Sequence, residues 1–318
     1  MNELLSIVIP SYDRLSSLSS NLFGILEELK EYSIPVYISD DSPHSEIHNF
    51  VSEYAKSHKY IYYYKNEPRL GHDKNFVKAL KRSKAAYTWI IGDRVRLKEN
   101  AIKTVIDLIS IKQIDIISVN KSDRNIDIPS RYFSEPINIF DMLGWHLTYT
   151  GATIYSKQAI KTLDLINIDQ YRNFPHIGLI FNHLLRNCSF FWINDYLIFA
   201  LPEKESYWID NAFSVFIDDW ENAVQNLPDI YHKELKSSTI LKHSLYSNLF
   251  STKFFLKMRM NDNYNTKIFK KYKNQILKHS NKSLLLLCII SVIPKWILKI
   301  GYYISILLVT KKSLNDIT

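Results

Sequence analysis

The chain has 318 residues, of which 46% are hydrophobic and 23% are charged, and this balance excludes a disordered protein. Its length suits a core domain with an appended region. The net charge of +8 at pH 7 favours a polyanionic partner, either nucleic acid or an anionic membrane surface.

Strands and helices alternate over the first 120 residues. Residues 4–9 are apolar apart from Ser6, which predicts a first strand covered on both faces and not a signal peptide. Further strands are expected at 34–39, 60–64, 86–91 and 114–119, with helices at 15–30, 45–57, 73–83 and 98–110. Strands separated by such helices predict right-handed βαβ units and a mostly parallel sheet of the α/β class.

This alternation ends after residue 119. Residues 120–150 are expected to form a loop with a helical turn at 137–142, followed by a strand at 148–155 and a short helix from Lys157. Pro175 suits the first turn of a helix that runs to about residue 187. Two short strands are predicted at 190–193 and 196–201, and helices are predicted from residue 211 onward.

The C-terminal region concentrates the positive charge. Residues 233–318 hold 16 Lys and Arg against 3 Asp and Glu, a net charge of +13, whereas residues 1–232 hold 24 against 29, a net charge of −5. Apolar runs at 284–293 and 300–309 are each shorter than the roughly 20 residues that span a bilayer. Because a lysine-rich segment precedes them, they favour two helices lying on a membrane over a pair of buried core helices. We therefore expect residues 253–310 to bind an anionic membrane surface.

Three loops follow strands whose carboxyl ends are expected to meet at one edge of the sheet. Residues 10–14 (PSYDR) follow the first strand, residues 40–42 (DDS) the second, and residues 92–94 (GDR) the fourth. Ligands of open α/β sheets bind at this edge. The carboxylates of Asp40 and Asp41 suit a base N–H or a ribose hydroxyl, so the arrangement predicts a nucleotide site.

The order and spacing of these segments resemble the family-2 glycosyltransferases, whose fold is the Rossmann-like GT-A fold. The resemblance rests on SIVIPSYDR at 6–14, VYISDDSPH at 36–44, and Asn66, Gly71 and Asn75 before AAYTWIIGDRVRL at 85–97; it weakens beyond residue 120. It implies a mostly parallel sheet flanked by helices. It also implies transfer of a sugar from a nucleoside-diphosphate donor to an acceptor hydroxyl, usually with inversion of the anomeric centre.

The resemblance also implies roles for residues of a donor site. The residues lining the base and ribose would be Pro10, Tyr12 and Asp40 or Asp41. Those shaping the pocket beside the phosphates would be Asn66, Gly71 and Asn75. Asp93 would belong to an acidic motif that binds Mn²⁺ or Mg²⁺.

The acidic motif departs from the family pattern, which has two or three acidic residues after the glycine. Here Asp93 is followed by Arg94 and Val95. A lone carboxylate can hold a hard cation that takes its other ligands from phosphate and water. Alternatively, Arg94 or Arg96 would neutralise the departing diphosphate, since a guanidinium binds phosphate in a bidentate manner. Loss of activity is the third interpretation.

The reaction also needs a general base for the acceptor hydroxyl. In many relatives an acidic pair serves at the start of a helix after the middle strands, and the corresponding segment here, 173–178, holds His176 instead. A histidine with its ordinary pKa of about 6.5 suits a base at neutral pH. A histidine that caps or packs the helix is the alternative, and Asp169 is the second candidate for the base.

Further along the chain, aromatic and polar residues are candidates for an acceptor site, because aromatic faces stack on sugar rings and carboxylates bind sugar hydroxyls. The candidates are Trp145, His146, Tyr149, Tyr207, Trp208 and Asp210. Aromatic residues make up 14% of the chain, so core packing is the competing interpretation.

The sequence thus predicts a catalytic domain at 1–210, with a nucleotide-sugar half at about 1–120 and an acceptor half at 121–210, and a basic helical region at 211–318. The expected enzyme is an inverting hexosyl- or N-acetylhexosaminyltransferase that uses a UDP-sugar, in the cytoplasm on the inner face of the cell membrane. Its acceptor would be a carbohydrate or a lipid-linked oligosaccharide of a bacterial surface polysaccharide, such as a capsule. An inactive sugar-nucleotide-binding module is the main alternative. A nucleic-acid-binding protein is disfavoured, because the basic residues of the tail lead into apolar runs.

Overall fold

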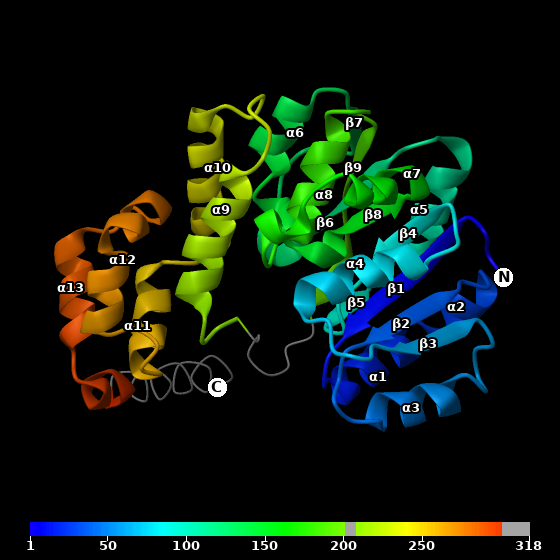
Figure 1. Cartoon of the computed structure of the whole chain (residues 1–318), viewed down its shortest axis with the longest axis horizontal. Coiled ribbons are helices and arrows are strands. Elements are labelled where there is room, and N and C mark those ends of the chain that lie inside the picture. The colour runs from blue at the N-terminus through cyan, green and yellow to red at the C-terminus, as the bar shows by residue number, and fades with distance from the viewer. Residues whose placement is uncertain (201–207, 301–318) are drawn as a thin grey trace, which may run out of the picture. The chain divides into compact units, whose positions relative to one another are not determined.

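The structure is a computed structural model that describes residues 1–200 and 208–300. These residues form two compact units. One comprises residues 1–200 with 219–236, and the other comprises residues 208–218 with 237–300. The first unit is built on one sheet and the second is helical (Figure 1).

The sheet of the first unit confirms the predicted α/β class. Its strands lie in the order β3-β2-β1-β4-β8-β6-β9-β5, and β7 pairs with β9. The strands that carry the N-terminal half run parallel: β1 (Leu5–Ser11), β2 (Val36–Asp40), β3 (Ile61–Lys65) and β4 (Tyr87–Ile90). An antiparallel strand, β8 (Thr153–Ser156), lies between β4 and β6 (Ile116–Lys121). The remaining strands are β5 (Val95–Leu97), β7 (Arg131–Phe133) and β9 (Phe190–Ala200).

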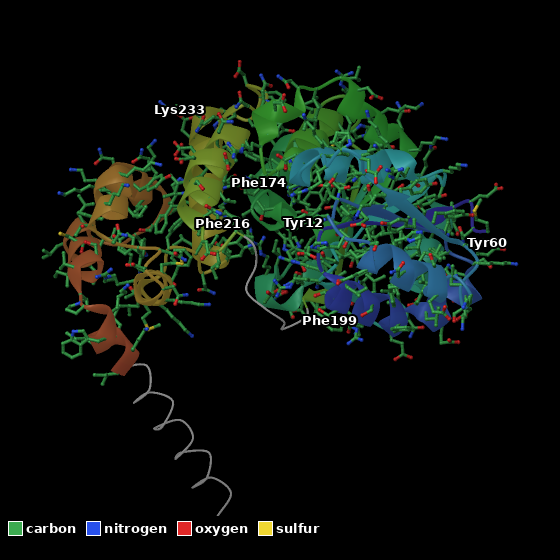
Figure 2. All side chains as sticks on the ribbon, turned by 60° about the horizontal axis from the view of Figure 1, so that its bottom comes forward. Tyr12, Tyr60, Phe174, Phe199, Phe216 and Lys233 are labelled. Atoms are coloured by element: carbon green, nitrogen blue, oxygen red, sulfur yellow. The ribbon has the colours of Figure 1, made fainter. Side chains whose placement is uncertain are left out.

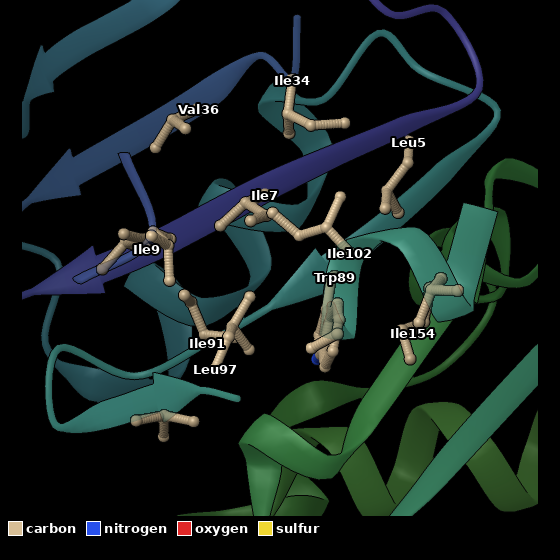
Figure 3. Close-up of a cluster of buried hydrophobic side chains, with 14 of the residues drawn as sticks. Leu5, Ile7, Ile9, Ile34, Val36, Trp89, Ile91, Leu97, Ile102 and Ile154 are labelled. Atoms are coloured by element: carbon tan, nitrogen blue, oxygen red, sulfur yellow. The ribbon is translucent and has the colours of Figure 1, made fainter. Parts of the chain in front are cut away.

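Helices cover both faces of this sheet. Successive residues of a strand point to opposite faces, so Leu5, Ile7 and Ile9 of β1 share one core with Trp89 and Ile102 (Figure 3). Complete burial of such a side chain contributes about 1.5–3 kcal/mol to folding. The helices on this face are α1 (Leu15–Gly24), α2 (Leu26–Glu31), α3 (Glu46–Tyr54) and α5 (Ala101–Ile111).

The opposite face carries the helices that matter most for the site. On this face Ser6 Oγ of β1 lies 2.6 Å from Ser83 Oγ, just after α4 (His72–Arg82). The ring centres of Phe76 and His176 lie 5.9 Å apart, so α4 packs against α8 (Pro175–Leu184). Pro175 opens α8 as predicted. The other helices of the unit are α6 (Pro136–Leu143), α7 (Lys157–Ile160) and α9 (Trp220–Gln225).

Four predicted elements differ from the structure. The helix expected at 15–30 is interrupted at Ile25 and becomes α1 and α2. The strand expected at 148–155 begins only at Thr153, because residues 146–148 and 150–152 form 3₁₀ turns. The two strands expected at 190–193 and 196–201 are one strand, β9, whose pairing with β6 shifts register beside Asn120.

The second unit packs short helices around aromatic side chains. The ring of Phe213 lies 5.5 Å from that of Tyr264 and 5.8 Å from that of Tyr272. The helices are α10 (Lys233–Tyr246), which begins in the first unit, α11 (Thr252–Met260), α12 (Thr266–His279) and α13 (Leu284–Val292). Within residues 1–200 and 208–300, no helix combines the length and apolar character that crossing a membrane requires.

Candidate active site

Asp41 organises the loop that leads into α4. This residue follows β2 and is 2% exposed. Its carboxylate accepts hydrogen bonds from the backbone N–H groups of Leu70 (2.8 Å) and Gly71 (2.9 Å), and from Asn66 Nδ2 (3.3 Å). Gly71 has a φ of 78°, which glycine adopts without the steric cost of a side chain. The carboxyl ends of β2 and β3 are therefore joined through Asp41.

The Asp40 carboxylate is occupied by bonds within the protein. Its Oδ1 accepts from the N–H of Ser42 (2.9 Å), and its Oδ2 accepts from the Tyr63 hydroxyl (2.6 Å) and from Lys65 Nζ (3.2 Å). Asp40 is completely buried. Asp40 therefore connects the ends of β2 and β3. A ligand would contact the residues around Asp40 and not its buried carboxylate.

Asn66 and Asn75 connect these strands with α4. Asn66 Nδ2 donates to Asn75 Oδ1 (2.9 Å), and Asn75 Nδ2 donates to the carbonyl of Ser39 (3.1 Å). Arg82 Nη2 donates to Asn66 Oδ1 (3.1 Å). The structure thus brings together the predicted donor-site residues Asp40, Asp41, Asn66, Gly71 and Asn75 in one largely buried network.

Tyr12 provides an aromatic face at the same edge. Its side chain, labelled in Figure 2, is 45% exposed, and the Arg69 guanidinium lies 4.4 Å from the ring centre. Arg69 Nε is also 3.8 Å from Asp41 Oδ2. An exposed ring beside a cation suits stacking of a nucleobase. Pro10 lies next to this loop in β1, in register with Ser39 of β2.

Asp93 lies beyond the end of β4, where it pairs with an arginine from the first loop. Its side chain is 13% exposed, and Arg14 Nη1 is 3.6 Å from Asp93 Oδ1. Burial raises the pKa of the Asp93 carboxyl to about 6, against the opposing effect of the positive charges of Arg14 and Arg94. The positive charges of Arg14 and Arg94 therefore favour the ionised form of Asp93, the carboxylate expected beside the phosphates.

Arg96 does not join this group. It lies in β5, and its Nη2 donates to the carbonyl of Ser20 in α1 (3.3 Å). A Cβ added to Gly24 would lie 2.7 Å from Arg96 Nε, so the guanidinium fills the space beside α1. Arg96 is thus held at α1, whereas Arg14 contacts Asp93 and the charge of Arg94 acts on Asp93. Sequence spacing alone does not distinguish Arg94 from Arg96. The structure does, because Arg96 lies in β5 and its side chain contacts α1.

The acidic motif does not form a complete metal site by itself. In the part of the chain that the structure describes, no three His, Cys, Asp or Glu side chains are grouped to hold a metal ion. Asp93 is a single carboxylate with Arg14 beside it. These residues fit a cation that takes most of its ligands from a bound diphosphate and water, and not one that the protein holds alone.

A second cationic group lies where β6 ends. Lys121 Nζ is 4.7 Å from the ring centre of Tyr149, and Lys121 pairs with Asp123. Arg124 Nη1 donates to Thr148 Oγ1 (2.7 Å). Burial and the Asp123 charge raise the pKa of Tyr149, while the charges of Arg124 and Arg94 lower it. The charge of Arg94 thus acts both on Asp93 and on Tyr149.

Two of the predicted acceptor residues are core residues. Trp145 is 4% exposed and His146 is completely buried. The ring of His146 bridges the carbonyls of Arg124 (3.1 Å) and Val119 (3.0 Å), and burial lowers its pKa to about 4. The core-packing interpretation therefore describes both residues, because neither offers a surface to a sugar.

Two further predicted acceptor residues lie in the second unit. Trp208 and Asp210 are part of the second unit, where Trp208 packs on Phe216 with ring centres 4.9 Å apart. Asp210 is exposed and accepts a hydrogen bond from Asn263 Nδ2 (2.8 Å). Tyr207 lies outside the described residues.

His176 lies in the expected first turn of α8 but is 2% exposed. Its Nε2 is 3.2 Å from the carbonyl of Thr148, and its ring lies near those of Phe76 and Phe174. Burial lowers its pKa to about 3. A neutral ring closed off from solvent does not suit a base for an acceptor hydroxyl, so the structure favours the packing role. The second candidate, Asp169, is an exposed residue of the 3₁₀ turn Ile168–Tyr171.

The structure adds three residues that sequence analysis did not select. Arg14 reaches Asp93. His72 and Asp73 stand at the start of α4, between Gly71 and Asn75, and Asp73 contacts the segment before α8. All three residues lie in segments that the sequence already assigns to the site. Arg14 is in the loop 10–14, and His72 and Asp73 are in the stretch 66–75.

Comparisons with known proteins agree with this fold. Residues 6–165 match the family described as Glycosyl transferase family 2. A structure of S. aureus TarS residues 1–349 in complex with UDP-GlcNAc has a TM-score of 0.58 at 14% identity, covering 87% of this chain and 82% of that chain. The mannosyltransferase PcManGT from Pyrobaculum calidifontis, in complex with GDP-Man and Mn²⁺, has a TM-score of 0.56 at 10% identity, covering 93% and 88%.

A longer S. aureus TarS structure has a TM-score of 0.55 at 13% identity over 87% of this chain, and the chain spans about half (49%) of its length. No curated protein matches the chain. The structural likenesses establish the fold, whereas the family match covers half of the chain. The matched residues include the segments that form the sheet edge described above. The protein therefore belongs to glycosyl transferase family 2.

Proposed function

We propose that the protein is an inverting glycosyltransferase that moves a hexosyl or N-acetylhexosaminyl group from a UDP-sugar to an acceptor hydroxyl. The observation that carries the proposal is the network at the ends of β2 and β3, with Tyr12 on one side of it and the Asp93–Arg14 pair also in the first unit. Residues 1–120 would bind the donor and residues 121–210 the acceptor.

Charge complementarity supports this placement of the donor. A nucleobase would stack on Tyr12 beside the loop that Asp41 holds. The diphosphate carries negative charge, which grows on the leaving oxygen as the glycosidic bond breaks, and preorganised cations stabilise it. Arg14 and Arg94 flank Asp93, so they are our candidates for this role.

Asp93 is the residue that would hold Mn²⁺ or Mg²⁺. The bound cation would supply further neutralisation of the diphosphate. Because Asp93 is a single carboxylate paired with Arg14 at 3.6 Å, we expect Mn²⁺ to bind weakly to the protein alone and more tightly together with UDP.

We further propose that the acceptor is a carbohydrate or a lipid-linked oligosaccharide of a bacterial surface polysaccharide, met at the inner face of the cell membrane. The support is helix α13, an apolar helix with one packed and one exposed side. Leu287 and Ile290 are buried, whereas Leu285 is 71% and Val292 is 55% exposed. Apolar side chains beside a lysine-rich segment suit an anionic lipid surface.

Donor turnover tests the proposed reaction. The purified chain is incubated with UDP-N-acetylglucosamine, UDP-glucose, UDP-galactose or GDP-mannose, with Mn²⁺ or with a chelator, and nucleoside diphosphate release and binding are both measured. We expect UDP-sugars to bind and to release UDP slowly to water, and chelation to weaken the binding. Asp93→Asn is expected to lose at least about 100-fold in release.

A matched control separates this loss from a general charge effect. Asp107 on α5 is exposed and pairs with Lys103, so Asp107→Asn removes a carboxylate away from the site and is expected to keep wild-type release. Binding of a donor without release of any diphosphate would favour an inactive sugar-nucleotide-binding module. Failure to bind any of the four donors would overturn the proposal.

A further inference from the structure

His72 and Asp73 form a histidine–carboxylate pair at the start of α4. His72 Nδ1 is 2.8 Å from Asp73 Oδ1, and the two side chains are 46% and 22% exposed. The pair follows Gly71 directly, and the N–H of Gly71 is held by the Asp41 carboxylate at 2.9 Å. The pair is therefore attached to the same loop as the proposed donor site.

The second oxygen of Asp73 connects this pair with α8. The backbone N–H of Asn173 donates to Asp73 Oδ2 at 3.0 Å. Asn173 has a φ of 61°, a left-handed conformation that asparagine tolerates better than most residues. Its side chain donates to Asp219 Oδ2 at 2.7 Å, which fixes its orientation. Asp73 thus contacts segment 173–178, where a general base is expected. That segment has no acidic residue of its own.

The hydrogen bonds assign different roles to the two side chains. Both Asp73 oxygens accept bonds, one from the imidazole and one from Asn173. Burial raises the pKa of Asp73, but the hydrogen bond and charge of His72 and the bond from Asn173 outweigh it, so the net pKa is lowered. An ionised carboxylate only accepts hydrogen bonds. In the neutral ring the proton is consequently on Nδ1, and the lone pair is on Nε2.

We propose that His72 is the general base of the sugar transfer and that Asp73 is its positioning residue. This inference rests on the proposed function. In the step, the acceptor O–H gives its proton to His72 Nε2 while its oxygen bonds to the anomeric carbon. The bond from that carbon to the diphosphate oxygen breaks, and its electron pair leaves with the nucleoside diphosphate.

The arrangement contrasts with that of His176. His176 is 2% exposed and its Nε2 faces the Thr148 carbonyl, whereas the His72 side chain is 46% exposed. Burial lowers the pKa of His176, and the charge of His72 lowers it further. The carboxylate in contact with the His72 imidazole is that of Asp73 on α4.

The first test substitutes the imidazole. The probe is water as acceptor, with whichever of the four nucleotide sugars the wild-type protein hydrolyses fastest, and UDP affinity is measured by calorimetry. His72→Gln is expected to lower kcat at least about 100-fold, as removal of a general base does, with UDP affinity unchanged. His232 is the matched control, because it is exposed and its Nδ1 lies 3.2 Å from Glu234 Oε2; His232→Gln is expected to keep wild-type kcat.

The second test asks whether Asp73 positions the imidazole. Asp73 holds the orientation and tautomer of the imidazole, so Asp73→Asn is expected to lower kcat while the KM for the donor and the affinity for UDP stay unchanged. Asp73→Glu, which keeps the carboxylate, is expected to restore part of the lost kcat. A purely structural role would change KM and UDP affinity together with kcat.

The outcomes separate the two levels of the proposal. If the wild type releases UDP and His72→Gln does so at the wild-type rate, His72 is not the base, although the glycosyltransferase stands. An unchanged kcat in Asp73→Asn, or a loss of kcat accompanied by equal changes in KM and UDP affinity, overturns the positioning role. If the wild type neither binds nor hydrolyses any donor, the proposed function itself fails.

Discussion

Asp93 combines a functional position with an environment that penalises its charge. In the folded chain its pKa is about 6, above its ordinary value of 3.8, and burial is the main cause. The stability that the protonated form contributes is complete below the ordinary pKa and is lost as the pH rises through 6. At neutral pH, therefore, the folded chain carries a carboxylate that costs stability.

Asp93→Asn is accordingly expected to stabilise the fold while abolishing donor turnover. The gain in unfolding free energy is about 1–3 kcal/mol above pH 7, reduced by the lost pairing with Arg14, and it vanishes near pH 4. Urea denaturation as a function of pH measures it. Asp107→Asn, at an exposed pair, is expected to show no such pH-dependent gain. A loss of stability in Asp93→Asn at pH 8 would contradict this account of the site.

Individual residues were predictable where the sequence carries local chemistry. Asp41 is predicted at the sheet edge because strand ends meet there, and Asn75 is predicted from the resemblance to family-2 glycosyltransferases. The structure brings both into one network through Asn66. For His146 and His176 the sequence leaves both a site role and a packing role open, because their burial depends on distant segments that close over them. The partner of Asp93 was missed for the same reason, since Arg14 is 79 positions away in the chain.

At the scale of elements, α8 depends on a glycine in its interior. A Cβ on Gly178 would lie 2.5 Å from the ring of Tyr171. That ring is 3% exposed, and its hydroxyl donates to the Asn226 carbonyl (3.1 Å) and accepts from Asn182 (3.0 Å). The ring cannot move aside without breaking these bonds, so α8 has no room for a side chain there.

Gly178→Ala is expected to lower the unfolding free energy by about 1–2 kcal/mol, because overpacking outweighs the better helix propensity of alanine. Thermal unfolding measures the change. Gly24→Ala is the control, since its Cβ would meet only the flexible end of Arg96, and it is expected to be neutral or stabilising. Equal effects of the two substitutions would argue against a rigid Tyr171 wall.

Elements with a strong apolar period were predictable, and short ones were not. β1, β2, β3 and β6 follow the expected apolar runs within a few residues. β5 and β7 contain three residues each, which is too few to show an alternating pattern. The stretch 148–155 is apolar enough for a strand, but its first half forms 3₁₀ turns beside the buried His146.

At the scale of the whole molecule, charge and apolar exposure coincide in the C-terminal region. Residues 233–318 carry a net charge of +13, against −5 for the remainder. Exposed apolar side chains of α13 recur at spacings of four and three residues, at Leu285, Ile289 and Val292. Helical spacing of this kind places them on one side of the helix.

The membrane proposal predicts that these side chains contribute to lipid binding. Full-length protein is sedimented with vesicles of phosphatidylglycerol and phosphatidylcholine in equal parts, or of phosphatidylcholine alone. We expect binding to the anionic vesicles that weakens as salt screens the lysines. Leu285→Glu is expected to reduce the affinity about tenfold or more, because burying a leucine side chain is worth about 1.5–3 kcal/mol.

Ile111 provides a matched control, because this residue at the end of α5 is 77% exposed and lies in the first unit. Ile111→Glu adds the same charge to the chain, so it lowers any purely electrostatic attraction by the same amount. If α13 enters the lipid surface, Leu285→Glu weakens binding far more than Ile111→Glu. If both variants bind alike, the attraction depends on net charge alone, and the exposed side of α13 has another purpose.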